Sequence, residues 1–144
     1  MKKPWSELKL CAYGSSRTDL RSDPTCVGVK KAEAEGRFST KPMGQAILDE
    51  IAAKTKDASE RHRLLHEYHN GRVAELVRTK EVWLDKPDIY PIKINQFNEV
   101  FEGNHRIRAI RYLGLDDVEV TVVEEAKPRG FNNVPDIWNE TSYV

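Results

Sequence analysis

The sequence predicts one domain of the α/β or α+β class, in which a small mixed β-sheet is combined with helices. Three observations support this fold class. The chain has 144 residues, which suits one hydrophobic core better than two. Apolar residues recur at helical spacing in the middle of the chain and alternate with polar residues nearer its carboxy-terminal end. Hydrophobic residues make up 39% of the sequence, which excludes global disorder although 32% are charged.

Charge, hydropathy and cysteine content restrict the class of protein further. The 23 basic and 23 acidic residues balance, so any nucleic-acid recognition must come from a local site. Cys11 and Cys26 stand in an otherwise cysteine-free chain, and we expect both to be free thiols. No window has the roughly 18 to 20 apolar residues of a membrane span, and the start does not resemble a signal peptide. These features predict a cytoplasmic protein without a membrane partner.

Residues 1–38 form an amino-terminal arm with few periodic signals. Its short apolar stretches lie at 8–13 and 26–29, between glycine, serine and proline residues that favour turns. Two short edge strands joined by a loop fit this pattern, and a partly disordered arm fits it nearly as well.

Residues 40–86 are predicted to be helical. Pro42 suits a first helical turn, and Ile47 and Ile51 recur at helical spacing, which indicates a helix over about 42–55.

A second, longer amphipathic helix is expected to follow. Asp57 and Glu60 have the spacing of a capping box, and Asn70-Gly71 is a candidate break that would divide the helix in two. Its apolar positions are Leu64, Leu65, Tyr68, Val73, Leu76 and Val77.

Residues 89–123 carry the pattern of a small core of strands and one helix. The expected elements are a strand at 92–94, a strand at 100–101, a helix at 106–113 and a strand at 118–122. Gly114 suits the end of that helix. The tail at 124–144 contains four large apolar residues, so we expect it to pack on the body. These are Phe131, Ile137, Trp138 and Tyr143.

The one segment that indicates a site is 100–106, which reads Val-Phe-Glu-Gly-Asn-His-Arg. It predicts a strand that ends in a glycine turn and opens directly into a helix. Such a junction presents backbone N–H groups at the positive end of a helix dipole, which suits an anion. His105 and Arg106 place positive charge where cations are disfavoured by about 0.3 to 1 kcal/mol each, and a bound anion would reverse that sign. An ion pair between Glu102 and Arg106 is the structural alternative.

At these residues the chain resembles the ParB/sulfiredoxin-like family, in which a strand leads to an Asp/Glu-Gly-x-His/Arg-Arg signature at the start of a helix. The resemblance covers residues 91–123. It implies a nucleotide-binding core in the carboxy-terminal half, with additional helices before it. It also implies that a nucleoside triphosphate or diphosphate, with Mg²⁺, is held by its phosphates. The residues that match the phosphate-binding loop are Gly103, Asn104, His105 and Arg106.

Departures from the family pattern narrow the function. Sulfiredoxin carries its reactive cysteine where this chain has Asn104, so reductase chemistry is excluded at this site. A partition protein continues into a helix-turn-helix region, whereas here only the tail at 124–144 follows the last predicted strand. We therefore expect a stand-alone nucleotide-binding module.

Chemical roles follow from the residue types. Glu102 is the one carboxylate in the loop and is the candidate general base or metal ligand. His105 is the candidate proton donor or charge stabiliser, and Arg106 suits bidentate phosphate contact. Arg108 and Arg111, together with basic residues of the 61–80 helix, are the candidate contacts to nucleic acid.

Two functions from different classes stay open. The first is a phosphoryl-transfer or phosphodiester-cleaving enzyme in DNA metabolism, such as a ParB-like nuclease, an NTPase or a phosphotransferase. The second is a non-catalytic module that senses a nucleotide or holds DNA or a protein, from a phage or mobile element. The sequence selects neither the nucleotide, nor the reaction, nor the oligomeric state.

The histidines of the long helix do not indicate a metal site. His62, His66 and His69 fall within one arc of the helix, but His66-Glu67-Tyr68-His69 is one residue short of the His-Glu-x-x-His spacing. Half-buried histidines at a packing face are expected instead. The interleaved arginines and glutamates of the same helix predict a solvated, salt-bridged face.

Overall fold

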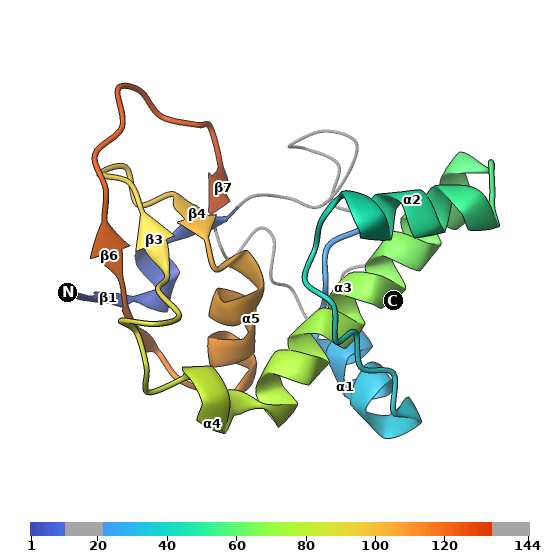
Figure 1. Ribbon diagram of the computed structural model, residues 1–144. Helices are drawn as coiled ribbons and strands as arrows, with labels where there is room; N and C mark the ends of the chain where they lie inside the picture. Colours follow the sequence, from blue (N-terminus) through green and yellow to red (C-terminus); the bar gives the residue numbers. More distant parts are fainter. Residues whose placement is uncertain (11–21, 134–144) are drawn as a thin grey trace.

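The computed structural model describes residues 1–10 and 22–133 (Figure 1). Strands lie on one side of the molecule and helices on the other, as an α+β fold predicts. In chain order the elements are β1 (Lys2–Pro4), the 3₁₀ turn η1 (Trp5–Glu7), β2 (Lys9–Leu10), α1 (Cys26–Glu35), α2 (Gln45–Lys54), α3 (Ala58–Arg78), α4 (Lys80–Trp83), β3 (Lys93–Ile94), β4 (Val100–Glu102), α5 (Asn104–Tyr112), β5 (Asp117–Glu119), β6 (Thr121–Val122) and β7 (Asn132–Asn133).

Three short ladders make up the strand side. In the largest, β3 lies between an antiparallel β4 and a parallel β6, so this sheet is mixed, as predicted. β1 pairs antiparallel with β5, and β2 with β7. The Val120 N–H, between β5 and β6, donates to the Met1 carbonyl at 2.8 Å. This bond links the β1–β5 ladder to the three-stranded sheet. A bridge between Lys9 and Glu99 connects β2 to β4 in the same way.

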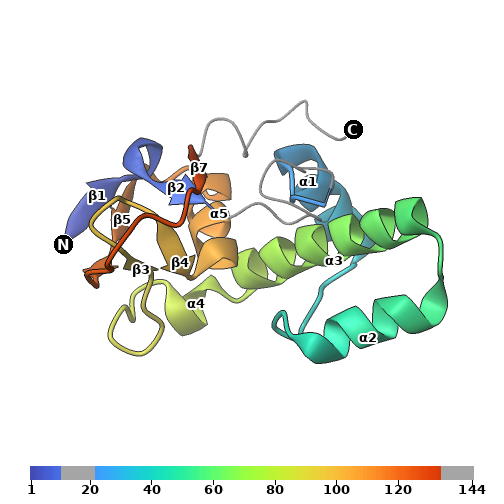
Figure 2. The ribbon, with the colours of Figure 1, turned by 90° about the horizontal axis from the view of Figure 1, so that it is seen from above.

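Helix α5 lies between the strands and α3 (Figures 1 and 2), and the main core lies around it. Its residues 107–110 are all buried, because apolar neighbours cover it on two sides. The Trp5 indole N–H donates to the Ile107 carbonyl at 3.2 Å and ties the amino-terminal segment to this helix. Other fully buried members of the core are Leu8, Leu10, Val29, Val73, Ile94 and Val100.

Helix α1 was not predicted, because the apolar stretch at 26–29 fitted an edge strand. The structure caps this helix with Thr25, whose hydroxyl accepts from the Gly28 N–H at 2.9 Å. Gly36, at φ 68°, ends it in the left-handed conformation. A Cβ at Gly28 would lie 2.3 Å from the Asn70 amide nitrogen, so the glycine allows α1 to approach α3 closely. α1 and α2 lie on opposite sides of α3 (Figure 2).

Helix α3 runs unbroken through Asn70 and Gly71, so the predicted break is wrong. Gly71 serves a close approach instead: its carbonyl accepts from the Ser39 N–H at 3.1 Å, and a Cβ there would lie 2.5 Å from the Ser39 hydroxyl. The capping box is also wrong, because Asp57 is the N-cap but makes no side-chain capping bond. The helix expected at about 42–55 is confirmed as α2, which begins after Gly44.

The predicted order of elements in residues 89–123 is confirmed. The one difference is that the expected strand at 118–122 divides at Val120 into β5 and β6, which pair with different strands. Gly114, at φ 81°, ends α5, and the Leu115 N–H returns to the Ile110 carbonyl at 3.2 Å.

In the tail, Phe131 is partly buried, and its N–H donates to the Glu99 carboxylate at 2.8 Å. The other apolar tail residues and Cys11 lie outside the described residues. None of the helices in the described part of the chain has the length and apolarity needed to cross a membrane.

Candidate anion-binding site

The turn between β4 and α5 depends on a glycine. Gly103 is the N-cap of α5 and has φ 93° and ψ 27°, a left-handed conformation that favours glycine. A Cβ at this position would lie 3.0 Å from Cγ1 of Ile92 on the neighbouring strand segment. The Asn104 side-chain amide donates to the Val100 carbonyl at 2.9 Å and braces the turn from inside. The predicted glycine turn and helix start are therefore confirmed.

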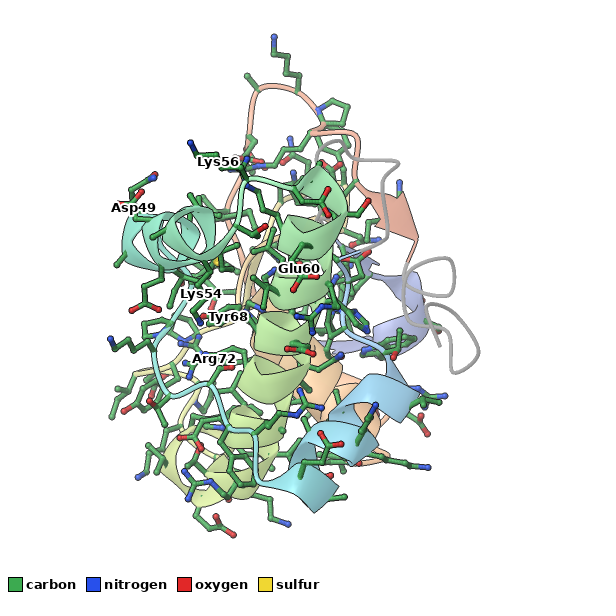
Figure 3. The ribbon with its side chains drawn as sticks, turned by 90° about the vertical axis from the view of Figure 1, so that its right-hand side faces the viewer. Asp49, Lys54, Lys56, Glu60, Tyr68 and Arg72 are labelled. Carbon is green, nitrogen blue, oxygen red and sulfur yellow. The ribbon has the colours of Figure 1, made fainter. Side chains whose placement is uncertain are left out.

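A pocket of about 540 Å³ opens at this turn. The structure brings all five predicted residues at 102–106 to its lining. Other elements complete it: α3 contributes Arg72 and Leu76, and the segment before α2 contributes Pro42 and Met43. Arg72 projects from the middle of α3 (Figure 3). The pocket therefore combines the start of α5 with a second cation and an apolar wall.

Arg72 and Arg106 place two guanidinium groups along this pocket. Arg106 donates to the Pro91 carbonyl at 3.0 Å, and its guanidinium lies 5.5 Å from the centre of the Tyr90 ring. Arg72 donates to the carbonyls of Ser39 and Thr40 at 3.2 and 3.3 Å. Burial lowers the pKa of Arg106, but a guanidinium stays charged at neutral pH. Arg72 was predicted only as one of the basic residues of the 61–80 helix that are candidate contacts to nucleic acid. Its place in this pocket was not predicted, because a basic residue on an amphipathic helix is ordinarily a solvated one.

Glu102 is exposed at the edge of the pocket. Its carboxylate lies 3.5 Å from the Lys93 ammonium across the β3–β4 ladder. Arg106 bonds to the Pro91 carbonyl, so the ion pair between Glu102 and Arg106 is not the contact that positions either group. The carboxylate is therefore accessible to a ligand in the pocket.

His105 differs from the predicted proton donor. Its Nε2 lies 2.8 Å from Nδ1 of His69, and His69 is only 1% exposed. Burial is the main cause that lowers the pKa of His69 to about 3 and the pKa of His105 well below its usual value. The nearby charge of Arg108 acts in the same direction on both. The two rings are therefore neutral at pH 7, and of the two basic residues predicted at the start of α5, His105 and Arg106, only Arg106 brings positive charge to the pocket.

Arg108 does not lie on the predicted nucleic-acid surface, whereas the contact of Arg111 with nucleic acid stays a prediction. Arg108 is fully buried, lies 3.8 Å from the Asp23 carboxylate and donates to the Asn104 carbonyl at 2.8 Å. It supports the first turn of α5 from behind and is not on the surface. Arg111 is exposed, but it pairs with Asp116 at 3.0 Å and lies over the Trp5 ring. The prediction for Arg108 is wrong because α5 is covered on two sides.

The histidines of α3 lie at a packing face, as expected. Nδ1 of His62 lies 3.0 Å from the Ser22 hydroxyl, and Nδ1 of His66 lies 2.8 Å from the Asp23 carbonyl. With His69 and His105 they form a polar seam between α3, the segment before α1, and α5. Over residues 1–10 and 22–133, no three His, Cys, Asp or Glu side chains are grouped as a metal site.

On the opposite face of α3, Arg63 bonds to both Glu60 and Glu67, which confirms a solvated, salt-bridged surface.

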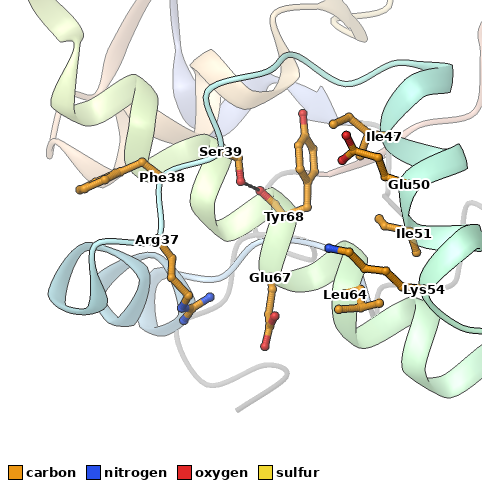
Figure 4. A pocket seen from close by; sticks show the side chains of 10 residues that line it. All are labelled: Arg37, Phe38, Ser39, Ile47, Glu50, Ile51, Lys54, Leu64, Glu67 and Tyr68. Carbon is orange, nitrogen blue, oxygen red and sulfur yellow. Dashed lines mark hydrogen bonds between the residues drawn. The ribbon is translucent and has the colours of Figure 1, made fainter.

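A smaller pocket, of about 240 Å³, lies between α2 and α3 (Figure 4). Ile47, Ile51 and Leu64 form its apolar part, and the Ser39 hydroxyl donates to the Tyr68 carbonyl at 2.9 Å. Two cations and two carboxylates also line it, so it favours neither sign of ligand charge. It contains none of the predicted site residues and is the weaker candidate.

No protein-family model matches the chain, and neither the curated proteins nor the solved structures returned a significant match.

Proposed function

We propose that the protein binds a nucleotide through its phosphates in the pocket at the start of α5. One observation carries this proposal: the left-handed Gly103 opens α5 into a pocket along which guanidinium groups from two separate elements lie. The resemblance of residues 91–123 to the ParB/sulfiredoxin-like family supports the same assignment.

The pocket supplies each kind of contact that a phosphate needs. The first backbone N–H groups of a helix have no partner within the helix, and the helix dipole favours an anion beside them. Arg72 and Arg106 add donors and charge.

The apolar wall favours a nucleotide over inorganic phosphate. Apolar side chains in the lining suit a sugar or a base. The residues of the apolar wall are Pro42, Met43, Leu76 and Phe101.

Two uses of a bound nucleotide are proposed. In an enzyme that transfers a phosphoryl group or cleaves a phosphodiester, Glu102 is the carboxylate that would activate a nucleophile or hold Mg²⁺ against the phosphates. In a sensor without turnover, Glu102 stays paired with Lys93. The neutral, hydrogen-bonded His105 favours the sensor, because it supplies neither a cation nor a readily transferred proton.

The test is a thermal-shift and calorimetric screen of inorganic phosphate and of nucleoside mono-, di- and triphosphates, with and without Mg²⁺. A ligand that binds only the native state raises the melting temperature, because it stabilises by RT ln(1 + [L]/Kd). Arg72→Glu and Arg106→Glu should each abolish this shift. Lys56→Glu is the matched control, since it makes the same charge change at an exposed position of the α2–α3 connection (Figure 3).

Turnover is measured in the same samples as phosphate release and as cleavage of labelled DNA. Glu102→Gln should keep binding and remove any turnover. The proposed function is wrong if no nucleotide stabilises the wild-type protein. It is also wrong if Arg72→Glu and Arg106→Glu bind the nucleotide as tightly as the wild type and the control Lys56→Glu do.

A further inference from the structure

A second pocket shares no lining residue with the candidate anion-binding site. Its volume is about 830 Å³. One wall is the loop that follows α4, and the other is the turn and strand after α5. The loop projects from the strand-bearing side of the molecule (Figure 2). The floor is apolar and is made by Trp83, Ile92, Ile110 and Val118. We call this pocket the acidic groove.

An exposed apolar side chain also lines the acidic groove. Leu115 belongs to its lining and is 41% exposed. Scattered apolar residues are ordinary on a surface, but a concave apolar floor beside an exposed apolar side chain is typical of a protein-interaction site.

The polar part of the lining is strongly one-sided. Four carboxylates, those of Asp85, Asp116, Asp117 and Glu119, face one lysine, Lys2. Exposed ion pairs engage two of them: Arg111 holds Asp116, and the Met1 ammonium holds Glu119. Such pairs contribute little and exchange readily. Asp85 and Asp117 lie on opposite walls and form no ion pair with another described residue.

We propose that the acidic groove binds a peptide segment of a partner protein in which bulky apolar side chains are flanked by lysine or arginine. The floor would receive the apolar side chains, and Asp85 and Asp117 would pair with basic residues on either side. Nucleic acid and anionic lipid do not fit, because the carboxylates repel polyanions. The acidic groove shares no lining residue with the pocket at the start of α5, and the charge of its lining is of the opposite sign.

The test is a selection of displayed random peptides on the full-length chain, followed by fluorescence anisotropy with the enriched peptides made synthetically. The enriched sequences should combine large apolar residues with lysine or arginine. Asp85→Lys combined with Asp117→Lys should weaken their binding roughly tenfold or more, because two attractive contacts become repulsive. Leu115→Ser should weaken it through the apolar contact.

The matched control is Asp49→Lys combined with Glu124→Lys, which changes the net charge equally at exposed positions away from the groove. It should bind the peptide as the wild type does. Backbone amide shifts in the wild-type protein provide a readout that needs no variant, and they should move at 82–90 and 114–119.

Three results would overturn the proposal: no enrichment, enriched peptides without basic residues, or binding that the groove variants do not change.

Discussion

The candidate pocket and the polar seam behind it are built from the same turn of α5, yet they treat charge in opposite ways. In the pocket, Arg106 is half-exposed and bonded to a carbonyl, so its charge is available to a ligand. In the seam, Arg108 is fully buried against Asp23, and His69 and His105 are neutral. Residues two positions apart on a helix point about 200° apart around its axis. One short motif therefore supplies both a binding surface and its internal support.

The strongest way to break this contrast is to remove the buried charge. Arg108→Met should lower the free energy of unfolding by about 3–5 kcal/mol, because it removes the buried cation that lies beside the buried carboxylate of Asp23. Arg111→Met, at an exposed pair on the same helix, should cost less than about 1 kcal/mol. Urea unfolding of both variants measures the difference. Equal losses would mean that the seam does not hold its charges more tightly than the surface does.

Acid should weaken the seam before it affects the carboxylates. The folded-state pKa values of His66, His69 and His105 lie below the ordinary 6.5, so the unfolded chain binds protons first as the pH falls. Stability is complete above pH 6.5 and is lost below it. The loss should reach about 1.4 kcal/mol per pH unit for each histidine that stays unprotonated in the folded state.

Glu99 contributes to acid sensitivity only at lower pH. Its pKa is lowered below 4.5, since its carboxylate accepts from the backbone N–H groups of residues 129–131. The range from pH 6.5 to 4.5 therefore reports mainly on the histidines. Urea unfolding at half-unit intervals gives the slope, and His69→Gln should reduce it. If the free energy of unfolding did not change between pH 6.5 and 4.5, the histidines of the seam would bind protons equally well in the folded and the unfolded chain.

The third and smallest expected effect concerns the glycine turn at the pocket. Gly103→Ala should cost about 1–3 kcal/mol, because alanine is strained at φ 93°. Gly114→Ala is the matched control: it has φ 81° but open space around its Cβ position. The excess cost at Gly103 reports the contact with Cγ1 of Ile92, so this excess should be smaller in an Ile92→Ala background, which lacks that atom. If Gly103→Ala and Gly114→Ala lowered the free energy of unfolding by the same amount, a steric role for that contact would be excluded.

Local signals explain what could be predicted from the sequence. The order of strands and helix in 89–123 followed from alternation, helical spacing and Gly114, which act between neighbours in the chain. Gly103 was predictable for the same reason, since a strand that turns into a helix within one residue favours glycine. The candidate loop therefore came from its own seven residues.

Contacts between distant segments explain what could not be predicted. Arg72 reaches the pocket because α3 crosses the start of α5, and no pattern within α3 indicates this crossing. Nothing in the sequence around Arg108 indicates that it is buried. It is buried because other elements cover α5 on two sides. The stacked rings of His69 and His105 depend on the same packing. Helix α1 was not predicted because the apolar stretch at 26–29 fitted an edge strand, and only the packing of Gly28 against α3 explains the glycine within it.

The close approach of α1 to α3 restricts how this sequence can drift. Asn70 is 3% exposed, accepts from the Thr25 N–H at 3.0 Å and lies 3.1 Å from the His66 ring, so its side chain cannot make room for a Cβ at Gly28. A larger residue at 28 requires a smaller one at 70, which removes the bond that holds the first turn of α1. In descendants of this gene, positions 25, 28 and 70 should therefore be inherited as a unit or replaced together.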